Sequence, residues 1–365
     1  MAKFHAKNER IKKKYLTWLE DARRKDVKTT TQVAAAISLF ERSTRHRDFA
    51  AFHFEQARKF KSDLEAAKNE RTGKPLSQAT IRARLNMVKA FFEWLSDQPG
   101  YKSKVDFTDV AYFSPSAKQD RIARAVRETP VPTIDQIRHV VSTASGQSAV
   151  EKRDRALIAF TLLTGMRDAA IASLPLGNVN LARREVFQDA RVVETKNSKT
   201  MTTFFFPVGD EFVQIVEGWV GFLKTELLYA ETDPLFPQTA IRPNDDGAFA
   251  VTGLKRAYWR DATAIRRIFR ERFEAAGLPY FRPHSFRKTL ARLAYNLNLN
   301  LKEAKAWSQN LGHEKPMTTW TSYGKIDDCQ TGEIMAGLAK GHNPASESVP
   351  PEALAWMMRQ IGGRR

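Results

Sequence analysis

The sequence contains a single cysteine, Cys329, among 365 residues. One cysteine cannot form an intramolecular disulfide, so the chain is unlike the small secreted proteins that disulfides stabilise. No run of apolar residues is long enough to cross a bilayer, and the basic start "MAKFHAKNERIKKK" is not followed by the apolar segment of a secretory signal. The sequence therefore predicts a cytoplasmic protein without a membrane partner.

Motifs for nucleotide and metal binding are also absent. The sequence has neither GxxxxGK[ST] nor GxGxxG, the glycine-rich loops that hold phosphate groups. Its seven histidines and one cysteine include no pair at the spacing typical of a zinc site. Any phosphate chemistry is therefore expected to proceed without a metal or another cofactor.

Acidic residues are scarce relative to basic ones. The chain has 41 Asp and Glu against 59 Lys and Arg, a formal net charge of +18. Such an excess is typical of proteins that bind a polyanion, most often nucleic acid, although a solubilising surface is the alternative. Residues 1–130 hold 28 of the basic residues and only 16 of the acidic ones, so we expect phosphate contacts mainly there.

The first third of the chain is predicted to be a helical domain, residues 1–115. Apolar residues recur at helical spacing over 11–24, 29–45, 49–68 and 78–97, the last capped by Ser77. Arg82 and Lys89 lie seven residues apart on that last helix, so both are candidate contacts to a DNA backbone; a solvated helix face is the alternative. Residues 116–132, which end in "PVP", are expected to form an extended connector.

Residues 133–330 are predicted to form a second domain of mixed type. Thr133 caps a first helix, and a second helix ends at Gly165. Two β-like runs, "RVVET" and "TTFFFPV", flank "KNSK", and helices are expected over 211–228, 252–276, 284–297 and 301–311. The fold class is therefore mainly α with a small antiparallel β-sheet. Residues 331–365 form a tail with two short apolar stretches.

Six residues of this second domain are candidates for catalysis. Each lies in a short motif that is weak by itself, because a lone arginine, lysine, histidine or tyrosine is usually structural. Arg167 lies in "TGMR", Lys196 in "TKNSKT", His284 and Arg287 in "HSFR", His313 in "LGH" and Tyr323 in "TTWTSYGK". Lys199 in the same turn is the alternative to Lys196.

The order of these motifs resembles the catalytic domain of the tyrosine recombinases, the phage-integrase family, over about 133–325. The N-terminal helices look like that family's core-binding domain. The resemblance implies two phosphate-binding arginines (Arg167 and Arg287), a catalytic lysine (Lys196), two histidines (His284 and His313) and a nucleophile, Tyr323, that forms a 3′-phosphotyrosyl link. One departure is Ala170, where the family commonly has an acidic residue; Asp168 is a nearby acidic residue.

The chemistry of the residue types agrees with the resemblance. Guanidiniums present planar, permanently charged donors to the oxygens of a phosphate under attack. A phenol, with a pKa of about 10, is a far more acidic nucleophile than an alkyl hydroxyl. Lysine is suited to protonate the departing 5′-oxygen.

The resemblance further implies the partners. These are double-stranded DNA with inverted-repeat sites, a homotetramer on two synapsed sites, and accessory proteins, with residues 331–340 packing into a neighbouring protomer. Two alternatives remain open from the sequence: a type IB topoisomerase that relaxes DNA as a monomer, and a non-catalytic DNA-binding protein that retains the fold.

Overall fold

The chain folds into two compact units, Met1–Arg127 and Glu128–Arg365, which are described separately here. Their structure is a computed structural model. Tyr323 and nearly all of the tail 331–365 lie outside the residues that it describes. The described residues are 4–70, 72–124, 130–144, 146–243, 248–297, 299–313, 331–332 and 335–337.

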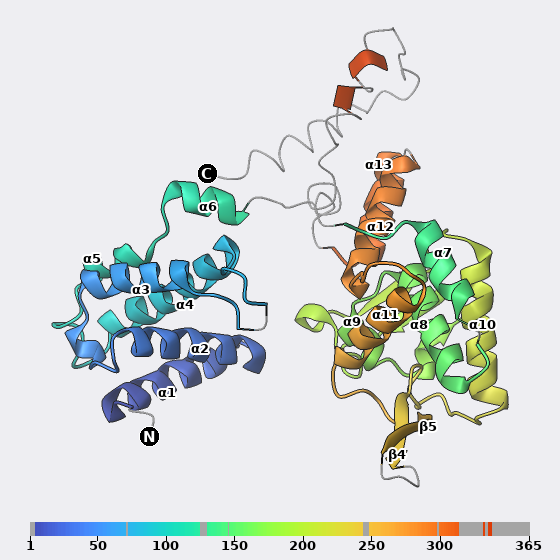
Figure 1. The fold of residues 1–365 in the computed structure, drawn as a ribbon, viewed down its shortest axis with the longest axis horizontal. Helices are drawn as coiled ribbons and strands as arrows, with labels where there is room; N and C mark the ends of the chain where they lie inside the picture. Colours follow the sequence, from blue (N-terminus) through green and yellow to red (C-terminus); the bar gives the residue numbers. More distant parts are fainter. Residues whose placement is uncertain are drawn as a thin grey trace. The chain divides into compact units, whose positions relative to one another are not determined.

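The described elements of the first unit are all helices, joined by turns and loops (Figure 1). Its helices pack around phenylalanine rings, and Phe40 contacts the rings of Phe60, Phe92 and Phe113 at centroid distances of 5.1–5.6 Å. Burial of such large rings stabilises a small bundle strongly. The elements are α1 (Ala6–Asp21), α2 (Val27–Ser43), η1 (Phe49–Ala51), α3 (Phe54–Ala66), α4 (Gln78–Ser96), α5 (Phe107–Val110), η2 (Ala111–Phe113) and α6 (Ala117–Arg124).

The predicted connector contains a helix. Ala117–Arg124 forms α6, where we expected extended backbone. Asp120 of α6 accepts a hydrogen bond from Nε of Arg82 on α4, at 2.5 Å. The prolines that suggested an extended chain, Pro130 and Pro132, come after this helix and leave it unaffected.

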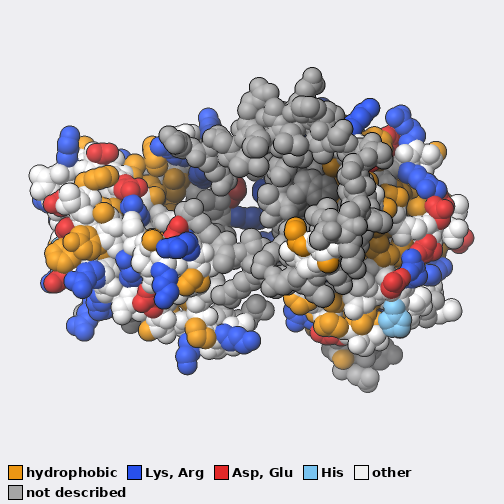
Figure 2. All heavy atoms as spheres, turned by 90° about the horizontal axis from the view of Figure 1, so that it is seen from above, with side chains coloured by type: hydrophobic (Ala, Val, Ile, Leu, Met, Phe, Trp, Pro, Cys, Tyr) orange, Lys and Arg blue, Asp and Glu red, His pale blue; other side chains and the backbone are white. Residues whose placement is uncertain are grey.

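Charge on the first unit agrees with the composition. Figure 2 shows Lys and Arg side chains on the visible surface of this unit, where they are more frequent than acidic side chains. Lys89 contacts residues of its own unit, Ser114 at 3.1 Å and Glu93 at 3.7 Å. Arg82 and Lys89 thus have intramolecular partners, and their contact with DNA stays a prediction.

The second unit combines helices with two small antiparallel sheets, which confirms the predicted fold class. One sheet has the order β1–β2–β3, with Val186 opposite Thr203, and the other is the hairpin β4–β5. The elements are α7 (Ile134–Thr143), α8 (Ala149–Thr164), α9 (Asp168–Ala172), η3 (Leu176–Asn178), β1 (Val179–Asn180), β2 (Glu185–Gln188), η4 (Lys196–Ser198), β3 (Met201–Phe204), α10 (Asp210–Thr225), β4 (Gln238–Pro243), β5 (Phe249–Lys255), α11 (Thr263–Ala275), α12 (Pro283–Asn296) and α13 (Leu301–Asn310).

Two predicted elements of this unit are wrong. The run "RVVET" is a turn, and the strand before the lysine is β2, Glu185–Gln188. The helix expected over 252–276 starts only at Thr263, because 252–255 belong to β5 and pair with β4. Gly253 has φ of 140°, which no helix accommodates. The β4–β5 hairpin extends away from the helices of its unit (Figure 1).

Helix α8 lies at the centre of the second unit. Its sequence "ALIAFTLLT" is apolar on every side, and residues 156–164 are all buried. It ends at Gly165, which has φ of 57°, as predicted for a helix C-terminus. A Cβ on Gly165 would lie 2.9 Å from both Leu290 and Leu311, so glycine is required for the conformation and for the space.

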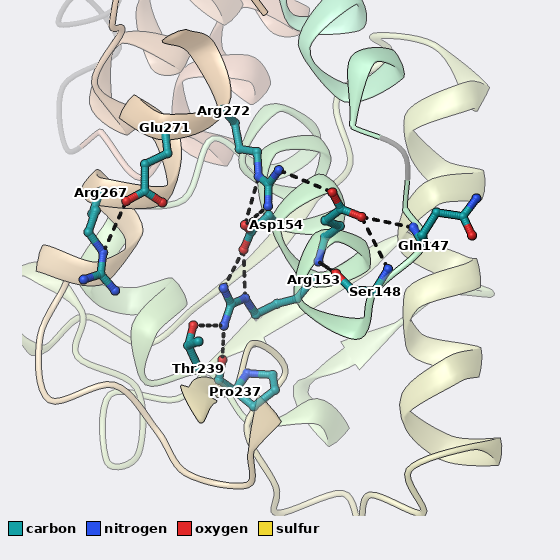
Figure 3. A network of polar contacts seen from close by, with 10 residues as sticks. Gln147, Ser148, Arg153, Asp154, Pro237, Thr239, Arg267, Glu271 and Arg272 are labelled. Atoms are coloured by element: carbon teal, nitrogen blue, oxygen red, sulfur yellow. Dashed lines mark hydrogen bonds and ion pairs between the residues drawn. The ribbon is translucent and has the colours of Figure 1, made fainter. Parts of the chain in front are cut away.

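A buried ionic network joins α8 to α11 and to the base of β4 (Figure 3). Asp154 accepts hydrogen bonds from Arg153, at 2.6 and 3.0 Å, and from Arg272, at 2.8 and 3.0 Å. Arg153 also donates to the carbonyl of Pro237 and the hydroxyl of Thr239. Two guanidiniums therefore share one carboxylate in the interior, and the hairpin is anchored at its base.

Within the described residues, no helix has the length and apolar character of a membrane span.

Candidate active site

Three of the sequence motifs meet at the guanidinium of Arg287. This side chain is 2% exposed, although it is charged. Its Nη1 donates to the carbonyl of Gly165 at 2.6 Å, and its Nη2 donates to the carbonyl of Leu311 and to Nε2 of His313 at 3.0 Å. The "TGMR", "HSFR" and "LGH" segments are therefore held together by one side chain, which explains how a buried arginine is tolerated.

Arg167 is positioned by the end of α8. After Gly165 turns the chain, Arg167 occupies the N-cap of α9 with extended backbone, φ −76° and ψ 143°. Its carbonyl accepts the N–H of Ile171 at 3.0 Å, so its backbone is part of the first turn of α9. The half-buried Arg167 side chain borders the same cavity as His313.

This cavity has a volume of about 260 Å³ and is strongly basic. Arg167, Lys196, Lys199 and His313 line it, together with uncharged side chains and Gly312. No aspartate or glutamate of the described residues lines it. Such a set of donors without a carboxylate is suited to an anion such as a phosphodiester.

The imidazole of His313 is neutral near pH 7. Burial and the guanidiniums of Arg287 and Arg167 lower its pKa to about 4, and Lys196 contributes to this effect. A guanidinium can only donate, so Nε2 of His313 accepts from Arg287 and the ring proton resides on Nδ1. His313 is therefore oriented to donate from Nδ1.

His284 lies in the first turn of α12, one turn before Arg287. Partial burial and the charges of Arg287 and Arg167 lower its pKa below the ordinary value. At neutral pH it is thus a neutral group within electrostatic reach of both arginines, a state in which it can accept a proton.

The turn from Glu194 to Lys199, here called the lysine turn, carries Lys196. Its backbone conformation and one of its contacts were not evident from the sequence. Asn197 and Ser198 both have positive φ, 59° and 49°, although neither is glycine. Such left-handed residues are strained and recur at functional sites. At the other end of the turn, the N–H of Glu194 donates to Ser173 Oγ at 2.8 Å, and this serine lies directly after α9.

Asn310 is a second residue whose role sequence reasoning missed. Its side-chain oxygen accepts the N–H of Phe204 at 2.7 Å, and its amide group donates to the Phe204 carbonyl at 2.8 Å. Asn310 therefore extends the edge of β3 and fixes the segment before His313 to the sheet. Nothing in a single sequence distinguishes this asparagine from a surface residue.

The structure thus brings together five of the six predicted catalytic residues, Arg167, Lys196, His284, Arg287 and His313. Lys199 also borders the cavity. The sixth, Tyr323, lies outside the described residues. Arg82 and Lys89 belong to the other unit, on α4.

The low pKa of His313 predicts a pH-dependent stability. The unfolded chain takes up this proton near pH 6.5, whereas the folded chain does so near pH 4. The contribution of His313 is therefore fully present above pH 6.5 and is lost as the pH falls towards 4. In urea unfolding at pH 7.0 and 5.0, His313→Gln is expected to lose less stability than the wild type. Equal losses in the two proteins would contradict the assignment.

Comparison with known proteins gives the family. A model described as the phage integrase family matches residues 131–329, more than half of the chain. The chain belongs to the phage integrase family. The resemblance inferred from the motif order is confirmed.

Curated relatives of this integrase-family chain are tyrosine recombinases. XerC of Corynebacterium efficiens is 27% identical over 245 residues, which cover 67% of this chain and 66% of the relative. XerC of Herpetosiphon aurantiacus is 24% identical over 247 residues, covering 67% and 69%. A XerC-like recombinase of Caldanaerobacter subterraneus is 20% identical over 269 residues, covering 68% of this chain and only 63% of the relative.

Solved structures of integrases share the fold. A lambda integrase dimer bound to a COC′ core site has a TM-score of 0.59 at 14% identity and covers 88% of this chain and 97% of that chain. The Tn1549 transposon integrase in complex with transposon right-end DNA has a TM-score of 0.55 at 17% identity, covering 90% and 99%. At such low identity these likenesses show the architecture.

Proposed function

We propose that this integrase-family protein is a site-specific DNA recombinase that cleaves and rejoins DNA through Tyr323. The observation that carries the proposal is the buried guanidinium of Arg287, which holds three motifs beside a basic cavity that no carboxylate of the described residues lines. The relatives named recombinases and the integrases solved on DNA support the same activity. Double-stranded DNA is accordingly the proposed substrate.

In the cleavage step, the phenolate oxygen of Tyr323 attacks the scissile phosphorus. Negative charge accumulates on the non-bridging oxygens, where Arg167, Arg287 and the Nδ1–H of His313 stabilise it. His284, neutral at physiological pH, accepts the phenol proton. The bond from phosphorus to the 5′-oxygen breaks as the new bond to tyrosine forms.

Departure of the 5′-oxygen needs a proton, and Lys196 supplies it. Lys196 borders the cavity and its charge reaches His313, which supports its assignment over Lys199. The product is a 3′-phosphotyrosyl link that retains the phosphodiester energy. A 5′-hydroxyl of a second strand attacks this link in the reverse sense, so rejoining needs no nucleotide.

The two lysines can be separated experimentally. With an ordinary phosphodiester, Lys196→Ala is expected to lower the single-turnover cleavage rate by about 10²–10⁴-fold, the contribution of a general acid. A 5′-bridging sulfur leaves without a proton, so such a substrate should restore most of the rate. Lys199→Ala should lower the cleavage rate far less, and the sulfur-containing substrate should not raise the rate of this variant. The opposite pattern would assign the role to Lys199.

The assembly that we propose follows the family. The helical domain, residues 1–115, would contact DNA with Arg82 and Lys89, residues 116–132 would link it to the catalytic domain 133–330, and Lys199 would contact the phosphate backbone. Protomers would bind inverted repeats in pairs and synapse two sites as a tetramer, with accessory proteins and the tail 331–365 controlling exchange between protomers.

The proposal is tested against its alternatives on two plasmids. One carries two copies of the DNA that flanks the gene of this protein, and the other carries none. A recombinase resolves or inverts only the first plasmid. Relaxation of both plasmids without recombination would favour a topoisomerase. Specific binding without any covalent adduct would favour a non-catalytic DNA-binding protein.

A further inference from the structure

We infer that the ion pair between Asp168 and Arg266 positions the cleavage machinery, by holding the start of α9 against α11 and by adding one negative charge to the cationic groups that act on the histidine of "HSFR". The inference rests on the proposed function and adds two residues to it. Neither residue is among the six catalytic candidates, and neither is given a contact to DNA.

Both oxygens of the Asp168 carboxylate are fixed. Oδ2 accepts from Nε of Arg266 at 2.7 Å, and Oδ1 accepts from the N–H of Ala169 at 3.1 Å. The Asp168 side chain is 20% exposed, whereas that of Arg266 is 55% exposed. An exposed ion pair of this kind adds little to global stability, so its position is the informative feature.

The position couples the pair to Arg167. Asp168 is the first residue of α9, and Arg167, the preceding residue, is the helix N-cap. Arg266 extends from α11, which packs against α8, α9 and α12. Through Asp168, the backbone that carries Arg167 is tied to a helix that also supports the "HSFR" segment. A shift of about 1 Å in such a group can cost 10²-fold in rate.

The Asp168 carboxylate also opposes the positive charge around His284. The groups that act on this imidazole are Arg287 and Lys288 on α12, Arg167 and Asp168 at the start of α9, and His313 after α13. The cationic members lower the pKa of His284, and Asp168 is the acidic member that raises it. The carboxylate therefore opposes the fall in the pKa of His284, which favours proton uptake by the imidazole while Arg167 and Arg287 bind phosphate.

Four variants of the full chain separate the two effects. Asp168→Asn removes the charge and keeps the shape. Arg266→Gln removes the ion pair and keeps the carboxylate of Asp168. The double exchange Asp168→Arg with Arg266→Asp restores an ion pair and reverses the charge at position 168. Asp261→Asn is the matched control, because the charge of Asp261 also acts on Arg266, and asparagine keeps the Oδ1 that accepts the N–H of Thr263.

Two readouts are needed: the pH profile of single-turnover cleavage, and the pKa of His284 from NMR of histidine-labelled protein, assigned with His284→Gln. Asp168→Asn should lower the pKa of His284, move the acidic limb of the profile to lower pH, and slow cleavage at neutral pH by about tenfold or more. Arg266→Gln should slow cleavage without lowering this pKa. The double exchange should lower the pKa further than Asp168→Asn.

The inference is wrong if Asp168→Asn matches Asp261→Asn in both the cleavage rate and the pKa of His284. It is also wrong if the double exchange restores the wild-type pH profile, since the sign of the charge at position 168 would then have no role. If the wild type itself cleaves no DNA, the proposed function fails, and the NMR titration still decides whether Asp168 sets the pKa of His284.

Discussion

Replacement of Arg287 with lysine is expected to lower the single-turnover rate of DNA cleavage by at least 10²–10³-fold, the typical effect of removing one preorganised donor to a developing oxyanion. A lysine keeps the positive charge but lacks the planar fork. It cannot reproduce the simultaneous bonds to Gly165, Leu311 and His313 that place the guanidinium. The rate loss should therefore come mainly from lost geometry.

The same variant should also be less stable, by about 1–3 kcal/mol, because buried carbonyls lose their donors. Cleavage is best compared at a temperature where both proteins are folded, as monitored by circular dichroism. Arg292→Lys is the matched control, because Arg292 is an exposed residue of the same helix. If Arg287→Lys cleaved DNA at the rate of the wild type, the role assigned to the guanidinium would be contradicted.

Replacement of Asp154 with alanine is expected to destabilise the second unit by about 3–5 kcal/mol, the usual effect of removing one partner of a buried ion pair. Two guanidiniums would lose their shared carboxylate, and that of Arg153 is 1% exposed. The network in Figure 3 connects α8, α11 and the base of β4, so the loss of the carboxylate would affect all three. Urea unfolding measures the change.

The control for this variant lies in the same figure. Arg267 and Glu271 form an exposed ion pair on α11, with side chains about 60% exposed, at 3.8 Å. Glu271→Ala should change the free energy of unfolding by less than about 1 kcal/mol. A similar small change for Asp154→Ala would show that the buried network is dispensable.

Much of the second unit could be predicted from local signals. The end of α8 at Gly165 and the cap at Thr133 depend on residue types whose backbone preferences are strong. The catalytic candidates were found by motif order, and the fold places Arg167, Arg287 and His313 together because α8, α12 and α13 meet at the Arg287 guanidinium.

Other features depend on contacts between distant segments, which a single sequence does not encode in any local pattern. The last four residues of β5, Thr252–Lys255, were predicted as the start of the helix that begins only at Thr263, and β4 was not predicted at all. Ser173 and Asn310 gain their roles only where α9 and α13 approach the lysine turn and β3. The Asp154 network likewise joins residues more than 80 positions apart.

The central claim is that Tyr323 becomes covalently joined to DNA. The most direct measurement uses a nicked suicide substrate that carries the protein's binding site, found by footprinting on the DNA that flanks its gene, and traps the 3′-phosphotyrosyl product. The wild type and Tyr295→Phe, which removes an exposed tyrosine hydroxyl from α12, should both form an adduct that peptide mass spectrometry maps to Tyr323, and Tyr323→Phe should form none. An adduct that persists in Tyr323→Phe, or one that maps to another residue, would contradict the account.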